Sequence, residues 1–222
     1  MLHAGMILNK HKRLIILGAS SHGKDCLDIA LKMGLWNEIA FLDDDVTKTQ
    51  ALGFRIIGNV DHASDFLPNS DFFVALGNVS LRELLTQKLD LIRANIVSLI
   101  HPSASIALNV DIDRGSCFFA NSVVNNSASI ARGCIVNIAA CVAHDAIIHP
   151  FVHLSPGSVI GGNVSIGSKA WIGMGAKVIS NVSICDETRI AAGTYVLKDI
   201  AATGVYHGLH AQFTLNHDVS FF

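Results

Sequence analysis

A hydrophobic residue recurs at every sixth position along the second half of the chain. The register holds from Ile100 to Val196 for seventeen consecutive repeats without a slip. Four residues after each of the first sixteen positions stands a small or β-branched side chain, beginning with Ala104. A period of six suits neither an α-helix nor a hairpin meander, and it predicts a triangular coil of short parallel strands with three hexapeptides per turn. We expect the hydrophobic column to point inward and the small residues to fit where the chain bends.

The overall composition argues against several classes of partner. The 222 residues carry a formal net charge of −2 and the pI is near 6.6, which disfavours nucleic-acid binding and a basic membrane patch. No apolar run has the length of a membrane span, and Met1–His11 does not have the pattern of a signal peptide. Met1–Lys10 is interpreted as a loosely ordered extension or as the result of an early start codon. The five cysteines form no CxxC pair, which favours reduced thiols in a cytoplasmic protein.

Charged residues are scarce in the repeat region. Only ten occur between Ser98 and Val196. A single coil with so little charge would expose large apolar surfaces, so we expect copies of the chain to pack against one another. From Thr203 onward the sequence looks irregular.

The first part of the chain alternates strand and helix signals, as an α/β domain does. One helix is expected to end at Gly34, and a second, capped by Ser80, to run to about Ala94. We divide the chain into an α/β domain of residues 12–97 and a repeat domain of residues 98–222. The other expected elements are the helical stretch Cys26–Met33 and the strands Leu14–Leu17, Ile39–Leu42, Phe54–Ile57 and Phe72–Leu76.

The turn after the first strand carries a weak phosphate-binding signature. Gly18, Ser20 and Gly23 occupy the three positions of a G-x-G-x-x-G fingerprint, with serine in place of the middle glycine. A helix N-terminus behind such a turn offers free N–H groups to an anion, but the serine argues against a dinucleotide lying flush on the backbone. Asp43 or Asp44, at the end of the second strand, is placed to hold a ribose or sugar hydroxyl. Alternatively, the turn has only a structural role and binds no ligand.

A group of histidines lies within the repeats. His144 is followed directly by Asp145, and His149 and His153 stand at outward positions further on. A histidine oriented by a carboxylate can act as a general base, although a single outward histidine is usually only a surface residue. The alternative is a zinc site, because His144 and His149 could be joined by a third histidine from a neighbouring subunit.

Six segments together resemble a known family. They are Gly18-Ala-Ser-Ser-His-Gly, Phe41-Leu-Asp-Asp, Phe72-Phe-Val-Ala-Leu-Gly-Asn, Ile100-His-Pro, Val142-Ala-His-Asp and Val152-His-Leu-Ser-Pro-Gly. The combination, spread from about Arg13 to Gly208, is similar to the PglD/NeuD-like hexapeptide-repeat sugar acetyltransferases. The resemblance implies a Rossmann-like α/β domain that binds a nucleotide-linked amino sugar. It also implies a left-handed parallel β-helix that assembles as a homotrimer.

The resemblance implies roles for individual residues. His144 matches the family's general base, and Asp145 matches the carboxylate that raises its basicity. His153 matches a histidine near the thioester end of acetyl-CoA, the co-substrate, and no metal is implied. The positions implied for the pantetheine arm are Gly162, Met174 and Ala192. Those implied for the nucleotide sugar are Ser20, Ser21, His22, Asp43, Asp44 and Gly77.

The implied activity is direct acetyl transfer. The resemblance is greatest to enzymes that N-acetylate a UDP-linked 4-amino-4,6-dideoxy sugar, on the route to bacillosamine-type sugars of bacterial glycans. His144 would take a proton from the sugar amine as the amine attacks the thioester, so no acyl-enzyme is required. The alternatives are a sialic-acid-type sugar O-acetyltransferase, a zinc-dependent hydratase of the carbonic anhydrase type, and a non-catalytic binding module.

The chain departs from the family pattern at two places. Ser21 stands where the family often has glycine, which narrows the turn. The segment Gly208-Leu-His-Ala lacks the proline that the family carries in its tail, so the resemblance does not extend to the tail's contacts with CoA.

Overall fold

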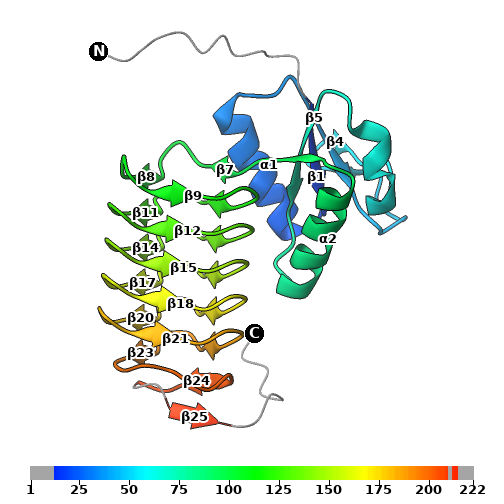
Figure 1. Ribbon diagram of the computed structural model, residues 1–222. Coiled ribbons are helices and arrows are strands. Elements are labelled where there is room, and N and C mark those ends of the chain that lie inside the picture. Colours follow the sequence, from blue (N-terminus) through cyan, green and yellow to red (C-terminus); the bar gives the residue numbers. More distant parts are fainter. Residues whose placement is uncertain (1–12, 210–211, 215–222) are drawn as a thin grey trace, which may run out of the picture.

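The computed structural model describes residues 13–209 and 212–214, and it consists of an α/β region beside a parallel β-helix (Figure 1). The expectations for Met1–Lys10 and for the end of the tail lie outside the described residues. Within the described part of the chain, no helix is both long and apolar enough to cross a membrane.

The α/β region is built on one parallel sheet with the strand order β2-β1-β5-β6. Its strands are β1 (Arg13–Leu17), β2 (Glu38–Leu42), β5 (Ser70–Val74) and β6 (Asn95–Ile96). Its other elements are α1 (Ser21–Met33), the hairpin strands β3 (Gln50–Ala51) and β4 (Phe54–Arg55), the 3₁₀ helix η1 (Val60–Phe66) and α2 (Val79–Leu91). Strand β1 lies between β2, which follows it in the sequence, and β5, which pairs with its other edge. Such a switch point at the carboxyl edge of a sheet is where α/β folds bind ligands.

Four of the expected boundaries in this region are wrong. The second helix is capped by Asn78 rather than Ser80, because the Asn78 side chain accepts the Leu81 N–H at 3.0 Å. The strand expected at Phe54–Ile57 has only two residues. The strand expected to reach Leu76 ends at Val74. The carbonyl groups of Leu76 and Gly77 accept hydrogen bonds from the Arg82 side chain of α2 instead of from a neighbouring strand. Helix α1 also begins earlier than the apolar pattern indicated.

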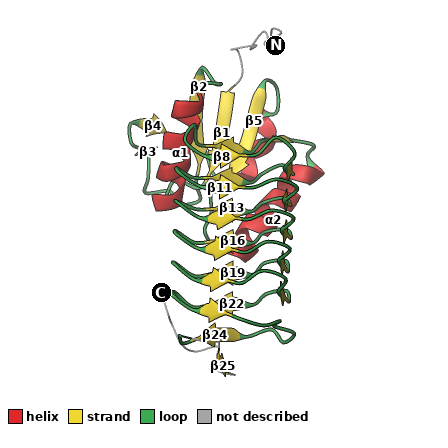
Figure 2. Cartoon of the chain, turned by 90° about the vertical axis from the view of Figure 1, so that its left-hand side faces the viewer, coloured by secondary structure: helices red, strands yellow, loops and turns green. Residues whose placement is uncertain are grey.

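The two faces of the α/β sheet are covered by different elements. Helix α1 packs Leu27 and Ile29 on one face, and on its other side the same cluster includes Cys117 and Ile135 of the β-helix. Helices η1 and α2 cover the opposite face. Helix α2 descends along the coils (Figures 1 and 2) and is tied to them by ion pairs from Asp90 to Arg114 and Arg132.

The β-helix has three sheets of two-residue strands, which we name sheets I, II and III. Sheet I contains β7 (Leu99–Ile100), β10 (Cys117–Phe118), β13 (Ile135–Val136), β16 (His153–Leu154), β19 (Trp171–Ile172) and β22 (Arg189–Ile190). Sheet II contains β8 (Ser105–Ile106), β11 (Val123–Val124), β14 (Cys141–Val142), β17 (Val159–Ile160), β20 (Lys177–Val178) and β23 (Tyr195–Val196). Sheet III contains β9 (Asp111–Ile112), β12 (Ser129–Ile130), β15 (Ile147–Ile148), β18 (Ser165–Ile166) and β21 (Ser183–Ile184). The strands pair in parallel at 18-residue spacing, as the hexapeptide period predicted.

The predicted inward column forms the core of the β-helix. From Phe118 to Val196 every sixth residue is buried, and the three earlier members pack against the same cluster. The bends have their own period: from Gly115 to Gly193 every sixth residue has a positive φ, including Asp145 and Phe151. This left-handed conformation turns the chain sharply between two strands, and glycine and asparagine adopt it most readily.

The expectation of an irregular tail after Thr203 is wrong. Strand β24 (Val205–His207) continues sheet I by pairing in parallel with β22, and β25 (Gln212–Thr214) then pairs with β24 in the antiparallel direction. Val205 and Tyr206 are buried, so the last coil is closed by apolar packing that follows no hexapeptide period.

Candidate active site

His144 and Asp145 form an exposed pair at the corner between β14 and β15. The imidazole Nδ1 lies 2.7 Å from a carboxylate oxygen of Asp145, and the two side chains are 61% and 51% exposed. Asp145 has φ 58°, so the turn of the corner itself brings its carboxylate back toward the ring. With Nδ1 held by the carboxylate as a donor, Nε2 keeps a free lone pair and can accept a proton.

Gly162 lies one coil beyond His144 and makes room for its ring. A Cβ at this position would stand 2.7 Å from both Cε1 and Nε2 of His144. Its N–H bonds to the Ser180 hydroxyl of the following coil at 3.1 Å. The resemblance placed Gly162 at the pantetheine arm, but the structural need for a glycine here comes from the histidine.

His153 lies on the outer side of β16, yet it is only 8% exposed, because the α/β region and its own neighbours cover this part of sheet I. Its ring packs on Trp171 with 4.3 Å between centroids. The Asn137 amide oxygen accepts the Ile138 N–H at 2.7 Å, which leaves the amide nitrogen to face His153 Nε2 at 3.4 Å. Nε2 is therefore the acceptor, and the ring proton is on Nδ1.

The Nδ1 of His153 is a buried donor. It has no hydrogen-bond partner among the described residues. Burial lowers the pKa of His153 to about 3, and the positive charge of Arg82 and the nearby His22 act in the same direction. The ring is consequently neutral at physiological pH, where it can donate a hydrogen bond but cannot serve as a charged acid.

Met174 and Ala192 occupy equivalent corners of successive coils, between sheets I and II. Both side chains are exposed, and the exposed fraction of Met174 is 58%. Each residue follows a strand of sheet I, the sheet that also contains His153. This column of flexible or small side chains suits an extended thioester arm that contacts mainly backbone, so the residues present fit the co-substrate.

The glycines of the phosphate-like turn have structural roles. Gly18 has φ +103°, and a Cβ there would lie 2.7 Å from the Leu76 side chain. A Cβ on Gly23 would lie 2.0 Å from the Gly18 carbonyl oxygen, so α1 can approach β1 only with glycine at this position. Ser20 and Ser21 are exposed at the N-terminus of α1, and the Ser20 side chain makes no capping bond.

Asp43 braces this turn, a role that the sequence pattern did not indicate. Its carboxylate accepts the Ala19 N–H at 2.6 Å and the Asp45 N–H at 2.9 Å. Asp44 accepts the Val60 N–H at 3.0 Å. Both carboxylates therefore already hold backbone groups, and each would have to bind a sugar hydroxyl through its remaining lone pairs.

The other two proposed sugar-binding residues lie at the same edge. His22 stacks on Phe119 of the β-helix with 5.6 Å between ring centroids. Gly77 follows β5, and no atom lies within 4 Å of the place where its Cβ would be. The turn, the ends of β2 and β5, and His22 together form the carboxyl edge of the sheet, directly against sheet I.

Apart from Met174 and Ala192 at the corner between sheets I and II, the predicted residues separate into two groups within one chain. His144, Asp145 and Gly162 lie at the corner between sheets II and III. His153 and the residues of the α/β region lie on sheet I and against it. His149 stands at the far end of β15 from His144, with Nε2 3.4 Å from the Ser165 hydroxyl. Among residues 13–209 and 212–214 no group of three or more histidine, cysteine or acidic residues could hold a metal ion.

The sequence analysis missed two partners of His153. Trp171 lies exactly one coil away and could have been found from the spacing of 18. Asn137 lies 16 residues away, and only the folded corner shows that it contacts the ring.

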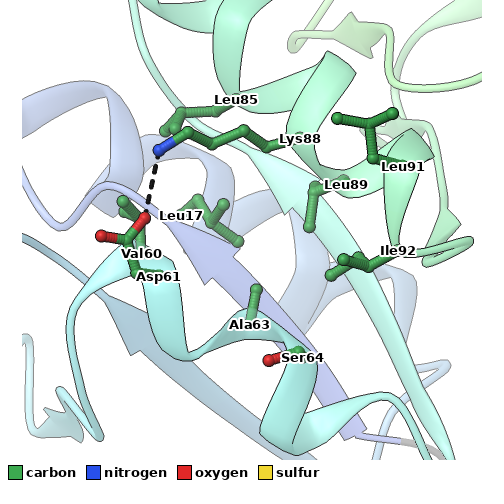
Figure 3. A pocket seen from close by; sticks show the side chains of 10 residues that line it. All are labelled: Leu17, Val60, Asp61, Ala63, Ser64, Leu85, Lys88, Leu89, Leu91 and Ile92. Atoms are coloured by element: carbon green, nitrogen blue, oxygen red, sulfur yellow. Dashed lines mark hydrogen bonds and ion pairs between the residues drawn. The ribbon is translucent and has the colours of Figure 1, made fainter.

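A cavity elsewhere in the α/β region contains none of the predicted residues. It has a volume of about 230 Å³ and lies between η1 and α2, on the face of the sheet away from α1 (Figure 3). Leu85 and Leu89 line it, and an ion pair of 3.1 Å between Lys88 and Asp61 spans its side. Its lining is mainly aliphatic.

Two family models match separate parts of the chain. Residues 13–89 match the PglD N-terminal domain, and residues 163–198 match the bacterial transferase hexapeptide repeat. GDP-perosamine N-acetyltransferase from Escherichia coli O157:H7 is 25% identical over 75% of this chain and 78% of its own length.

Two solved structures are similar over nearly the whole chain. The acetyltransferase domain of PglB from Neisseria gonorrhoeae FA1090, also solved with acetyl coenzyme A, is 32% identical with a TM-score of 0.89, over 92% of this chain and 100% of that chain. A mutant of perosamine N-acetyltransferase from Caulobacter crescentus, in complex with CoA and GDP-perosamine, is 30% identical with a TM-score of 0.86, over 91% of this chain and 97% of that chain. The chain therefore belongs to the PglD-like family of hexapeptide-repeat sugar acetyltransferases.

Proposed function

We propose that this enzyme transfers an acetyl group from acetyl-CoA to the amino group of a nucleotide-linked 4-amino-4,6-dideoxy sugar. The observation that carries the proposal is the exposed His144–Asp145 pair, whose Nε2 is free while Nδ1 is held at 2.7 Å from the carboxylate. Acetyl-CoA is the acetyl donor.

The reaction needs one proton acceptor and good alignment. His144 Nε2 takes a proton from the sugar amine as the nitrogen attacks the thioester carbonyl, and the thiolate of CoA leaves. The Nδ1–H of His153 is proposed to donate a hydrogen bond at the thioester end, which would satisfy a donor that is otherwise unpaired among the described residues. Both substrates are bound together, so proximity supplies much of the rate enhancement.

The complete site is proposed to form between two copies of the chain. The His144 group and the His153 group lie at different parts of the triangular coil, and a groove between adjacent β-helices would bring one group from each copy together. Exposed aliphatic side chains on the coils, including Ile138, Ile147 and Ile179, support packing between copies. Light scattering is expected to give the mass of a trimer, three times 23.7 kDa. A monodisperse monomer with full activity would contradict a shared site.

The nucleotide is proposed to be UDP, on the resemblance described above, whereas two similar proteins carry GDP-perosamine in their names or complexes. The test is a panel of UDP-, dTDP-, GDP- and CMP-linked sugars, with amino acceptors and hydroxyl acceptors, assayed for CoA release. The highest kcat/KM is expected with UDP. Faster turnover of the GDP sugar would change the nucleotide, and turnover only of hydroxyl acceptors such as sialic-acid-type sugars would replace N-acetylation by O-acetylation.

A cytoplasmic location is proposed on two grounds. All five cysteines have free thiols in the structure. Acetyl-CoA and nucleotide sugars are substrates that a protein meets in the same reducing compartment.

A further inference from the structure

Arg82 of α2 is a buried arginine whose hydrogen bonds all go to carbonyl oxygens. The residue is 1% exposed. Nε bonds to the Gly133 carbonyl at 2.9 Å, and Nη2 to the Phe151 carbonyl at 2.9 Å. Nη1 bonds to the carbonyls of Leu76 at 2.8 Å and Gly77 at 3.0 Å. One planar guanidinium thus holds four backbone groups from three segments of the chain.

Those segments lie in the α/β region and in two successive coils of the β-helix. Leu76 and Gly77 form the loop after β5, where the nucleotide sugar is proposed to bind. Gly133 and Phe151 are equivalent corner residues of two successive coils, and Phe151 precedes His153 by two positions. Arg82 therefore links the sugar-binding edge of the α/β region to the coil that carries His153.

The corner at Phe151 is itself tightly fixed. Phe151 has φ 63°, a conformation that a bulky residue rarely adopts. Its ring covers Gly133, where a Cβ would lie 2.4 Å from the ring. The β-helix end of the link is consequently rigid, and the loop after β5 is the part that Arg82 positions.

Burial of a cation that has no carboxylate partner costs desolvation free energy. Burial lowers the pKa of Arg82 to about 10, which still leaves it protonated at neutral pH. A hydrophobic side chain of similar volume would fill the same space without that desolvation cost. Its advantage over a hydrophobic residue is the rigid fork of donors, which fixes the relative position of several acceptors at once.

We propose that Arg82 is a positioning residue that sets the sugar-binding loop at Leu76–Gly77 in register with the His153 coil. The proposal rests on the proposed function for its consequence in catalysis. Arg82 acts through the backbone and touches neither substrate. Loss of its geometry would let the sugar amine drift from the thioester, and a displacement of about 1 Å can cost about 10²-fold in rate.

The first test compares Arg82→Lys with Arg132→Met in the full-length enzyme. Lysine keeps the charge, but a single ammonium cannot span four carbonyls. The control loses the Arg132–Asp90 ion pair, which also joins α2 to the β-helix but does not touch the loop. We expect Arg82→Lys to raise KM for the nucleotide sugar at least tenfold and to lower kcat by about 10²-fold, with KM for acetyl-CoA unchanged within twofold. Arg132→Met should leave all three constants within twofold.

Two kinetic outcomes would overturn the proposal. In one, Arg82→Lys lowers the melting temperature but keeps the wild-type kinetic constants. In the other, Arg132→Met produces the same change in the KM for the sugar. In either case Arg82 would hold the fold together without positioning the loop.

The second test needs no turnover, so it separates failure of this proposal from failure of the proposed function. It compares hydrogen exchange of the Ala75 amide, bonded to Leu17 at 2.8 Å, with that of the Phe151 amide, bonded to Arg132 at 2.9 Å. In the wild type the two amides should open as one cooperative unit. In Arg82→Lys the Ala75 amide should exchange faster while Phe151 is unchanged. If the lysine variant does not fold, the exchange rates of the wild type still test the proposal. Fast exchange of the Ala75 amide together with slow exchange of the Phe151 amide would show that Arg82 does not couple the two segments.

Discussion

The β-helix and the α/β region hold their functional residues in different ways. In the β-helix the backbone repeats every coil, and the position of His144 is filled by Asn126, Gly162 and Ser180 in neighbouring coils. In the α/β region the turn at Gly18 depends on contacts from separate segments, including Asp43 and Leu76. A side chain of the β-helix can therefore change while the backbone stays in place, whereas a change at the turn alters both binding and stability.

The largest effect is expected from His144→Ala. The variant loses the only proton acceptor proposed for the sugar amine, so kcat should fall by about 10²–10⁴-fold with little change in the KM for acetyl-CoA or in stability. Steady-state kinetics and thermal melting of the same preparations check this. A large loss of stability would contradict the contrast between the two regions.

His149→Ala is the matched control for His144→Ala. Its ring contacts only the Ser165 hydroxyl among the described residues, and direct transfer gives it no role. We expect kcat within about twofold of wild type. Equal losses in both variants would favour the zinc alternative instead, and zinc analysis of the purified protein would then decide.

Asp43→Ala, unlike a substitution in the β-helix, should lower both the stability of the protein and its affinity for the nucleotide sugar. The change removes a charged acceptor from the N–H groups of Ala19 and Asp45, which are bonded at 2.6 Å and 2.9 Å. Hydrogen bonds to charged groups contribute about 1.5–3 kcal/mol, so the free energy of unfolding should fall by about that amount and binding of the nucleotide sugar should weaken together with it. Denaturant unfolding and calorimetry measure the two effects.

Asp45→Ala provides the control in the same loop. Among the described residues its carboxylate bonds to exposed groups of Thr47 and Lys48, so the expected loss of unfolding free energy is much smaller than for Asp43→Ala. Similar losses of unfolding free energy for Asp43→Ala and Asp45→Ala would contradict a role of Asp43 in stabilising the turn.

Gly162→Ala should lower kcat about tenfold while the fold is retained. The added Cβ would lie 2.7 Å from the His144 ring, which must rotate away from its present orientation. A double variant with His144→Ala separates this steric effect from others, because Gly162→Ala should add nothing once the ring is gone. An additional loss of kcat in the double variant would assign Gly162 a direct role with the co-substrate.

The burial of His153 predicts a change in the pH dependence of stability. The pKa of His153 is lowered to about 3 in the folded state, from 6.5 when free, so unfolding takes up a proton below about pH 6.5. The stabilisation from the neutral ring is present above that pH and is lost as the pH falls toward 3. At most it amounts to about 1.4 kcal/mol per pH unit. In His153→Gln the unfolding free energy should fall less steeply between about pH 6 and 4 than in wild type.

Exposed His149→Gln serves as the control for that slope, which it should leave unchanged. Denaturant titrations at fixed protein concentration give the comparison. Parallel curves for wild type and His153→Gln would contradict the buried, neutral state of His153.

The sequence predicted the β-helix more fully than the α/β region. The period of six identified the inward column, and the pairing of His144 with Asp145 followed from their adjacency at a corner. Non-periodic contacts were not predictable in the same way. The burial of His153 depends on the α/β region packing over sheet I, and the bracing role of Asp43 depends on a turn 24 residues away. The fork of Arg82 joins positions up to 69 residues apart, which no local pattern records.

The strands β24 and β25 have a consequence for how the molecule avoids unwanted association. A solenoid of parallel strands ends in a row of free N–H and C=O groups, which can template the addition of another chain. Strand β25 runs antiparallel along β24 and occupies that row on sheet I, through the register from Val205 to His207. The reversal of direction also breaks the parallel pattern that a further coil would need. On sheet I the last parallel strand is thus covered, and a further coil cannot continue this sheet in the same direction.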